Sequence, residues 1–241
     1  MIKICNLYLI IILFLILLFI KYKFLEKKLV NENEKDIFIL NNFLSYDDFT
    51  KLQNLLKDIK NKNRQDNFLR KGSSISHFEM NDDLKEIKEI FRDPKILVKI
   101  KEETGMNLQL VTRFDSNQIS LLFYEKPNDG MDWHYDGSIY HGTRWAGIYT
   151  IFNKNRDNEC CSSAQFSYKE NNEIVNINNP ENSLILFRGD KLEHKVGSIK
   201  ENELRVVVSL LFCDICQMNM NPIYLVRQLF INFIFYGKFS I

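Results

Sequence analysis

The sequence predicts a mainly β domain, an antiparallel sandwich or barrel, with bracing helices on its N-terminal side. From Leu108 onward, β-branched and aromatic residues gather in short runs separated by turn-rich stretches. The last run, Leu204–Cys213, is apolar on both faces, so we expect it to be a central strand that is covered on both sides. The clearest runs are 118–124, 145–152, 183–187 and 204–213.

The residues before Leu108 carry the helical part of the prediction. Ser45 can cap the first helix, with Asp48 three residues on as a capping-box partner, and leucines then recur at helical spacing. Pro94 occupies the favoured first position of the third helix, which should end at Gly105. In order, we expect a strand at 37–40, a helix from Ser45, a polar loop at 61–66, a helix capped at Asn81 and a helix from Asp93.

Both ends of the chain are strongly apolar. A run of about 17 apolar residues ends at Lys21 and is long enough for a short transmembrane helix. We interpret residues 1–22 as an uncleaved single-pass anchor, because no small-residue cleavage site follows. The lysines after the run favour a cytosolic domain by the positive-inside rule, but the orientation stays open. Residues 217–241 are expected to form an apolar tail that packs on the domain or lies on the membrane.

Composition excludes several classes of protein. The net charge is +1, from 32 basic and 31 acidic residues, so we expect no nucleic-acid partner. A hydrophobic content of 45% excludes a disordered chain. The five cysteines are too few and too clustered for a disulfide framework. A zinc site made of Cys160, Cys161, Cys213 and Cys216 is less favoured than buried or free thiols, because adjacent cysteines chelate one ion poorly.

Three residues suggest a metal site. His134 and Asp136 stand two residues apart, so an extended strand would project both from one face. His194 lies at an expected strand edge and could supply a third ligand. Two imidazoles and one carboxylate on one face of a metal make the facial triad of non-haem Fe(II) oxygenases, which leaves positions open for a co-substrate and dioxygen. Taken alone the pattern is weak, since His-x-Asp also occurs by chance.

Arg205 adds a second kind of site. It lies in the predicted central strand and shares a face with Val207, Ser209 and Leu211. A buried guanidinium is costly unless paired, and the carboxylate of a ligand could pair it. The alternative is a surface arginine at the start of the strand, beside acidic residues.

Several sequence blocks, in the right order, resemble the Fe(II)- and 2-oxoglutarate-dependent dioxygenases, in particular their prolyl 4-hydroxylase-like branch. The resemblance covers nearly all of residues 36–214, and several blocks in order are far more specific than any one motif. The blocks are Asp36–Ser45, Leu121–Tyr124, Trp133–Asp136 followed by Ile148–Asn153, Ser183–Asp190, and His194–Val196 followed by Glu203–Ser209.

The resemblance implies a double-stranded β-helix core, also described as a jelly roll or cupin-like fold, preceded by the N-terminal transmembrane helix. The oxygenase domain would span 23–216, with helical support at 36–107 and the β core at 108–215. Its cofactors would be Fe(II), with 2-oxoglutarate and dioxygen as co-substrates and ascorbate as an optional reductant.

The resemblance also implies roles for single residues. His134, Asp136 and His194 would bind iron, Arg205 would bind the distal carboxylate of 2-oxoglutarate, and Tyr124 would hydrogen-bond the co-substrate. The residues implied for the site thus match the set reached from spacing and burial. Tyr149 is offered as a second co-substrate tyrosine, although the family position aligns with Ile151.

The expected activity is hydroxylation of an unactivated C–H group by a membrane-anchored enzyme, most readily at a prolyl residue of a peptide or protein. Hydroxylation of a lipid or small molecule is an alternative, as is a catalytically inactive 2-oxoglutarate-binding module. His141 either lines a substrate cleft or lies in an exposed loop, and His77 is expected to be structural. The family analogy also allows a domain in the lumen of the endoplasmic reticulum.

Overall fold

The computed structural model describes residues 35–57, 59, 62–81, 84–219 and 221–237, and Asp36–Ile241 form one compact unit. The predicted anchor at 1–22 lies outside the described residues. Within those residues, every helix is too short or too polar to cross a bilayer. The helices are α2 (Tyr46–Leu56), α3 (Lys85–Arg92), α4 (Pro94–Thr104) and α5 (Pro222–Tyr236), with a 3-10 turn, η2, at His77–Glu79.

The strands follow the chain in order. They are β1 (Ile37–Leu40), β2 (Asn63–Asp66), β3 (Arg70–Ile75), β4 (Gln109–Leu110), β5 (Ile119–Tyr124), β6 (Gly130–His134), β7 (Arg144–Lys154), β8 (Phe166–Glu170), β9 (Glu173–Ile177), β10 (Ser183–Phe187), β11 (His194–Val196) and β12 (Leu204–Cys213).

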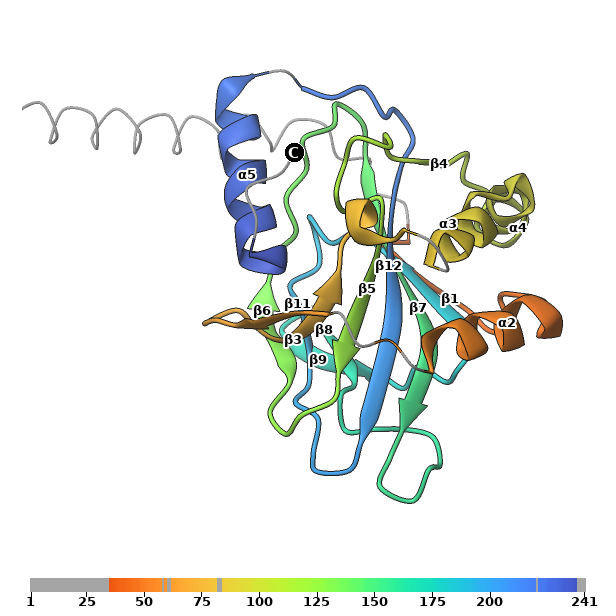
Figure 1. The fold of residues 1–241 in the computed structure, drawn as a ribbon. Helices are drawn as coiled ribbons and strands as arrows, with labels where there is room; N and C mark the ends of the chain where they lie inside the picture. Colours follow the sequence, from red (N-terminus) through yellow and green to blue (C-terminus); the bar gives the residue numbers. More distant parts are fainter. Residues whose placement is uncertain (1–34, 58, 60–61, 82–83, 220, 238–241) are drawn as a thin grey trace, which may run out of the picture. The chain divides into compact units, whose positions relative to one another are not determined.

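The strands form one antiparallel sheet (Figure 1). Side chains from several of its strands line one cavity. Its order is β1-β10-β7-β12-β5-β3-β6-β11-β8-β9, with β2 beside β3 and β4 beside β12. β8 and β10 are each second from one end of this order, yet the rings of Phe166 and Phe187 meet at 4.8 Å between centroids. The ends of the sheet therefore face each other across the cavity. The mainly β prediction is confirmed, and the arrangement agrees with a jelly-roll core.

β12 is central and is covered on both sides, as its sequence predicts. It pairs with β5 on one edge and with β7 on the other. Val206, Val208 and Leu210 pack under helices α2 to α4 in one apolar core, whereas Val207 and Leu211 face the cavity. The two-residue period of an extended strand separates these two sets.

The helices begin mostly where the sequence predicts. The Ser45 hydroxyl accepts the Asp48 N–H at 3.2 Å, and α4 runs from a cap at Asp93 to Gly105 in the left-handed conformation. The second helix differs from the prediction, since α3 starts at Lys85 rather than just after Asn81. The Asn81 carbonyl accepts the Leu84 N–H at 3.0 Å, ahead of the first residue of α3.

The predicted polar loop at 61–66 is wrong in part, because β2 occupies Asn63–Asp66. This strand pairs with β3 from Asn63 opposite Ser74 to Asp66 opposite Lys71. Only β3 continues into the sheet, where it pairs with β5 and β6. β2 is an outer strand and buries few side chains, so it needs no alternation of apolar and polar residues. Its sequence therefore does not look like a strand.

The expected C-terminal tail folds onto the domain as α5, which contacts β2 and β3. The Asn221 side chain caps its start at the Ile223 N–H, and Gly237 ends it at a φ of +70°. Of the alternatives for residues 217–241, packing on the domain is therefore the one observed for the described part of this segment.

The stability of the domain should fall as pH drops from about 6.5 to about 4, partly through His77. This side chain is buried, and its Nε2 lies 3.1 Å from a guanidinium nitrogen of Arg92. Burial, and then the charge of Arg92, lower the pKa of His77 from 6.5 to about 4. The unfolded chain therefore takes up the proton first, which favours unfolding over this pH range.

Denaturant unfolding at a series of pH values would measure this effect. His77→Gln should lose less stability on acidification than the parent chain. The same acid dependence in both proteins, at equal folded secondary structure, would contradict the assignment.

Candidate active site

The three candidate metal ligands come together at one end of the cavity. His134 ends β6 and His194 begins β11, and their Cα atoms are directly paired in the antiparallel ladder. Asp136 follows β6 by two residues, where its N–H donates to the Gly189 carbonyl at 2.8 Å. One ligand atom from each of the three side chains lies within 4.8 Å of the others. Residues distant in sequence are thus placed as one donor set.

Backbone carbonyls orient both imidazoles toward the aspartate. The Nδ1 of His134 lies 2.7 Å from the Asp132 carbonyl, and that of His194 lies 2.8 Å from the Leu192 carbonyl. These contacts favour the proton on Nδ1, so each Nε2 presents a lone pair. The two Nε2 atoms are 3.8 and 4.0 Å from Oδ1 of Asp136, a separation that suits donors around a common ion.

The protonation states also suit a divalent cation. Packing of His194 against Phe166 and Phe187 buries it and lowers its pKa to about 4, so the ring is neutral at physiological pH. Burial would raise the pKa of Asp136, but the charge of Arg144 outweighs it and lowers that pKa. Asp136 is therefore an ionised carboxylate beside the imidazoles, as in a two-histidine, one-carboxylate site.

Arg144 and Gly189 define the position of Asp136 in ways that spacing alone did not reveal. A guanidinium nitrogen of Arg144 lies 2.9 Å from Oδ2 of Asp136, which leaves Oδ1 toward the imidazoles. Gly189 is the residue whose carbonyl holds the Asp136 backbone, and any Cβ there would overlap the Asp136 carboxylate.

Arg205 lies in the same cavity with no anion beside it. Its side chain is 1% exposed, and none of its three guanidinium nitrogens has a hydrogen-bond partner among the described residues. The guanidinium carbon is 5.7 Å from the ring centre of Tyr124, its Cα partner on β5. Unpaired burial of this charge is costly, so the cavity is complementary to a carboxylate. Val207, Ser209 and Leu211 line the cavity on the same face, as predicted.

Tyr149 is not brought to the cavity. Its ring packs against Phe91 at 5.2 Å between centroids, and its hydroxyl donates to Asn182 Oδ1 at 2.9 Å. Ile151 belongs to the same apolar core under the helices, whereas Ile148 lines the cavity. His141 is also outside the cavity lining; its N–H donates to the Gln217 carbonyl at 3.0 Å.

Helix α5 supplies a wall of the cavity that sequence reasoning did not foresee. Gln228, Ile231 and Tyr236 line the cavity. Asn232 holds the helix in place by accepting from Asn117 Nδ2 at 2.8 Å, and the Tyr236 hydroxyl donates to Asn117 Oδ1 at 2.9 Å. Gln228 and Asn232 stand four residues apart in an otherwise apolar segment, and this spacing could have indicated a helix with one polar face.

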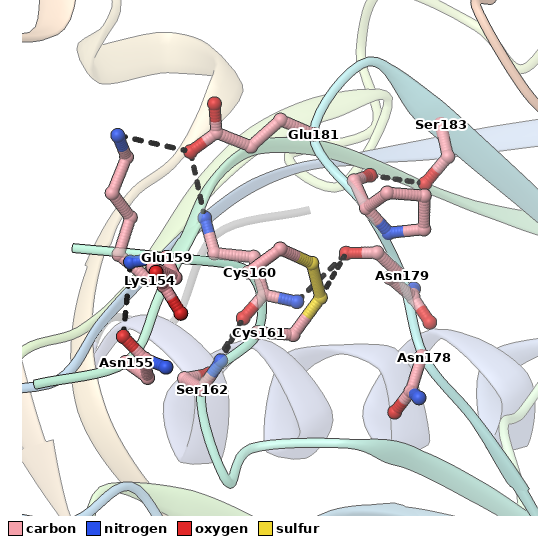
Figure 2. The surroundings of a disulfide bond; sticks show 12 residues. Lys154, Asn155, Glu159, Cys160, Cys161, Ser162, Asn178, Asn179, Glu181 and Ser183 are labelled. Atoms are coloured by element: carbon pink, nitrogen blue, oxygen red, sulfur yellow. Dashed lines mark hydrogen bonds and ion pairs between the residues drawn. A yellow bond between two sulfur atoms is a disulfide. The ribbon is translucent and has the colours of Figure 1, made fainter. Parts of the chain in front are cut away.

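The cysteines form disulfides rather than the thiols that the sequence led us to expect. Cys213 pairs with Cys216, and Cys160 with its neighbour Cys161 (Figure 2). With all four thiols paired, the zinc alternative is not formed either.

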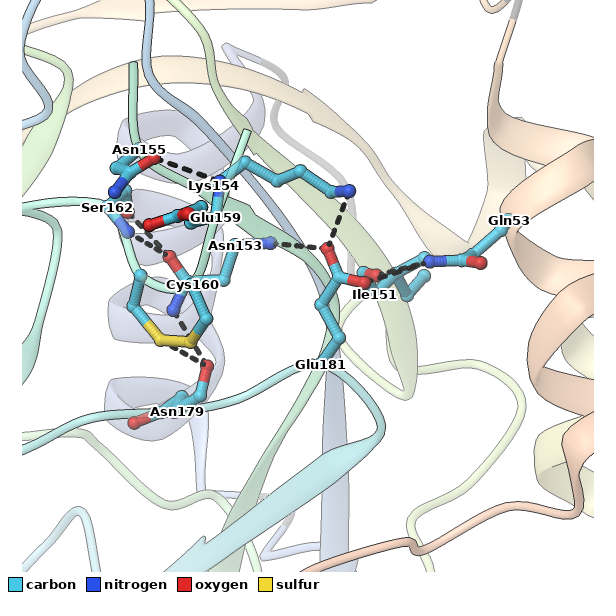
Figure 3. A network of polar contacts seen from close by, with 11 residues as sticks. Gln53, Ile151, Asn153, Lys154, Asn155, Glu159, Cys160, Ser162, Asn179 and Glu181 are labelled. Atoms are coloured by element: carbon cyan, nitrogen blue, oxygen red, sulfur yellow. Dashed lines mark hydrogen bonds and ion pairs between the residues drawn. A yellow bond between two sulfur atoms is a disulfide. The ribbon is translucent and has the colours of Figure 1, made fainter. Parts of the chain in front are cut away.

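A polar network beside the Cys160–Cys161 disulfide supports the strand end that carries Arg205. The buried amide of Asn153 accepts from the Ser162 N–H at 2.9 Å and donates to the Asn179 carbonyl at 2.7 Å. The Glu181 carboxylate accepts from the Asn153 N–H and from Gln53 (Figure 3). Asn153 is the Cα partner of Arg205 across β7 and β12, so this network fixes the backbone next to the guanidinium.

Gly189→Ala should weaken metal binding by tenfold or more, because the added methyl group must push the Asp136 carboxylate away from the imidazoles. Calorimetric titration with Mn(II) would measure the change. Gly105→Ala is the matched control, since it strains a left-handed residue at the end of α4 with open space around it. An Mn(II) affinity of Gly189→Ala equal to that of Gly105→Ala would contradict this role.

Comparison by sequence gives no relative: no family model matches the chain, and no curated protein matches it. Comparison by structure does. A 2-oxoglutarate-Fe(II) oxygenase-family oxidoreductase from Burkholderia pseudomallei has a TM-score of 0.59 at 8% identity, over 76% of this chain and 88% of that chain. A Trichoplax adhaerens prolyl hydroxylase, solved with a peptide fragment of hypoxia inducible factor, has a TM-score of 0.54 at 18% identity, over 76% and 85%.

A third neighbour is the α-ketoglutarate-dependent epimerase SnoN of nogalamycin biosynthesis, with a TM-score of 0.57 at 11% identity, over 75% of this chain and 78% of that chain. At these identities the likeness shows the fold alone, which this chain shares with these three proteins. The resemblance found in the sequence blocks and the fold thus agree.

Proposed function

We propose that this protein is an Fe(II)- and 2-oxoglutarate-dependent dioxygenase that hydroxylates an unactivated C–H group. One observation carries the proposal: a two-histidine, one-carboxylate donor set and a buried arginine without an anion share one cavity. Either feature alone has other uses. Together they fit a metal ion and a dicarboxylate that spans from it to a cation.

Each residue has a defined part in this proposal. His134, Asp136 and His194 would hold the iron, with Arg144 keeping Asp136 ionised and turned toward it. Arg205 would bind the distal carboxylate of 2-oxoglutarate through charge-assisted hydrogen bonds, which fixes the orientation of the co-substrate. Tyr124, buried beside Arg205, would contact the same molecule.

The bound iron would supply the oxidative step, coupling decarboxylation of 2-oxoglutarate to succinate with insertion of one oxygen atom into a C–H bond. The contribution of the chain is an enclosed, water-poor space around that reaction. Apolar side chains from opposite strands line the cavity between the triad and Arg205. They include Leu122, Ile148, Phe166, Phe187 and Val207.

For the substrate we propose a prolyl residue of a peptide or protein. The sequence blocks that resemble prolyl 4-hydroxylases support this choice, as does the fold shared with a prolyl hydroxylase solved with a peptide. A lipid or a small molecule is the alternative, and the shared fold with the epimerase SnoN favours a small molecule. Mass spectrometry for products heavier by one oxygen atom, across peptide and metabolite libraries, would decide between them.

We further propose that residues 1–22 anchor the enzyme as a single-pass membrane protein, on the basis of their apolar run. The lysines that follow the run favour a cytosolic domain, whereas the two disulfides favour an oxidising compartment. These two features point to opposite sides of the membrane. Ascorbate is proposed as an optional reductant.

Arg205→Gln should raise the Kd for 2-oxoglutarate about 30- to 150-fold, as expected for loss of roughly 2–3 kcal/mol of charge-assisted hydrogen bonding. The variant should also melt at a higher temperature than the parent chain in the absence of 2-oxoglutarate, since it removes an unpaired buried charge. Anaerobic titration of the Mn(II)-loaded protein would measure the Kd.

The control for Arg205→Gln is Arg156→Gln, which neutralises an exposed arginine and should change neither quantity. A 2-oxoglutarate affinity of Arg205→Gln within twofold of the control would remove Arg205 from the co-substrate site.

His134→Ala separates an enzyme from an inactive 2-oxoglutarate-binding module. In an enzyme, conversion of 2-oxoglutarate to succinate without substrate should be measurable in the Fe(II)-loaded parent chain and should fall at least 100-fold in the variant, because one metal ligand is lost. His141→Ala removes an imidazole outside the cavity and should keep the parent rate. A parent chain that binds 2-oxoglutarate and Mn(II) yet forms no succinate would favour the module.

A further inference from the structure

Helix α5 exposes an apolar face to solvent and includes two amides on its buried face, unlike an ordinary surface helix. Its buried face carries the amides of Gln228 and Asn232, four residues apart. Its exposed face carries Ile223, Val226, Phe230 and Phe233, which are 41%, 65%, 58% and 43% exposed. A surface helix in water normally does the opposite, with apolar residues toward the core. The outer face of α5 is therefore suited to an apolar surrounding.

The exposed apolar residues form a continuous surface. Their spacing of three, four and three residues places them on one stripe along the helix. Phe68, which is 82% exposed, lies at the β2–β3 turn, where the adjacent Asn67 donates to the Ile234 carbonyl of α5 at 2.9 Å. This surface extends beyond the helix, and a patch of that kind marks an interaction site.

The described domain begins close to the candidate metal site. The Asp36 carbonyl accepts the Arg188 N–H at 2.9 Å, and the next residue, Gly189, contacts Asp136 of the candidate metal site. At the same site, a Cβ on Gly137 would collide with the Arg227 guanidinium of α5. The start of the domain and α5 thus both border this site, and the sequence before Asp36 carries the long apolar run.

We propose that the outer face of α5 lies on the lipid bilayer into which residues 1–22 insert. This inference rests on the membrane anchoring in the proposed function. The helix then lies in the interface plane, with Ile223, Val226, Phe230 and Phe233 among the acyl chains and its amides turned to the cavity. The cavity wall that α5 supplies is consequently at the membrane surface, so the substrate is a group held at or in the bilayer.

Fluorescence quenching by brominated lipid would test this contact. The full chain carrying Phe230→Trp is reconstituted in phosphatidylcholine vesicles with dibrominated acyl chains, and its fluorescence is compared with that in unbrominated vesicles. The signal of Trp133 and Trp145 is subtracted by means of the parent chain. We expect the added tryptophan to lose at least half of its emission. Ile223→Trp gives a second position on the stripe, should Phe230→Trp fail to fold.

Val98→Trp is the matched control, because Val98 is 54% exposed on α4, away from α5 in Figure 1. It should show no quenching. Equal quenching at Phe230→Trp and Val98→Trp would overturn the inference. The inference would also be overturned if the stripe were not quenched and chemical cross-linking showed it covered by a second copy of the chain or by residues 1–34.

Two further measurements separate failure of this inference from failure of the proposed function. Flotation of the parent chain with vesicles tests the anchor, and 2-oxoglutarate titration of the Mn(II)-loaded protein tests the site. A chain that floats and binds 2-oxoglutarate but shows no quenching along the stripe leaves the enzyme proposal intact and removes only the placement of α5.

Discussion

The alternation of side chains along β12 is the constraint on which the rest of the structure depends. One set of residues builds the core under helices α2 to α4, and the other set, which begins with Arg205, faces the cavity. A slip of one residue in the pairing of β12 would exchange the two sets. Arg205 would then lie in the apolar core and Val206 in the cavity. Pairing on both edges, with β5 and β7, prevents such a slip.

The sequence was most informative where one strand carries the whole pattern. The period of two in Leu204–Cys213 predicted both faces of β12, and the two-residue spacing of His134 and Asp136 placed them on the same side of the chain. His194 was chosen from its place at an expected strand edge, and the resemblance of ordered blocks agreed with that choice, but no local pattern pairs two distant strands. Its Cα pairing with His134 supplies the geometry that spacing could not.

Features that depend on contacts between distant segments could not be predicted from local patterns. The ion pair of Arg144 with Asp136 and the close approach of Gly189 need three segments, distant in sequence, to meet. β2 has no apolar alternation, because its pairing with β3 uses backbone hydrogen bonds. Tyr149 was offered as a substitute because it shares a strand face with Ile151, the aligned position. That face packs into the apolar core under the helices, so the Tyr149 hydroxyl bonds Asn182 instead.

The depth of Arg205 has a kinetic consequence. Arg205 is 1% exposed, whereas the side chains of His134 and Asp136 are 11% and 15% exposed. A molecule that already fills the space beside the triad would block the path to the guanidinium. The proposed reaction must then follow a compulsory order, in which the dicarboxylate binds first and the molecule to be oxidised binds second.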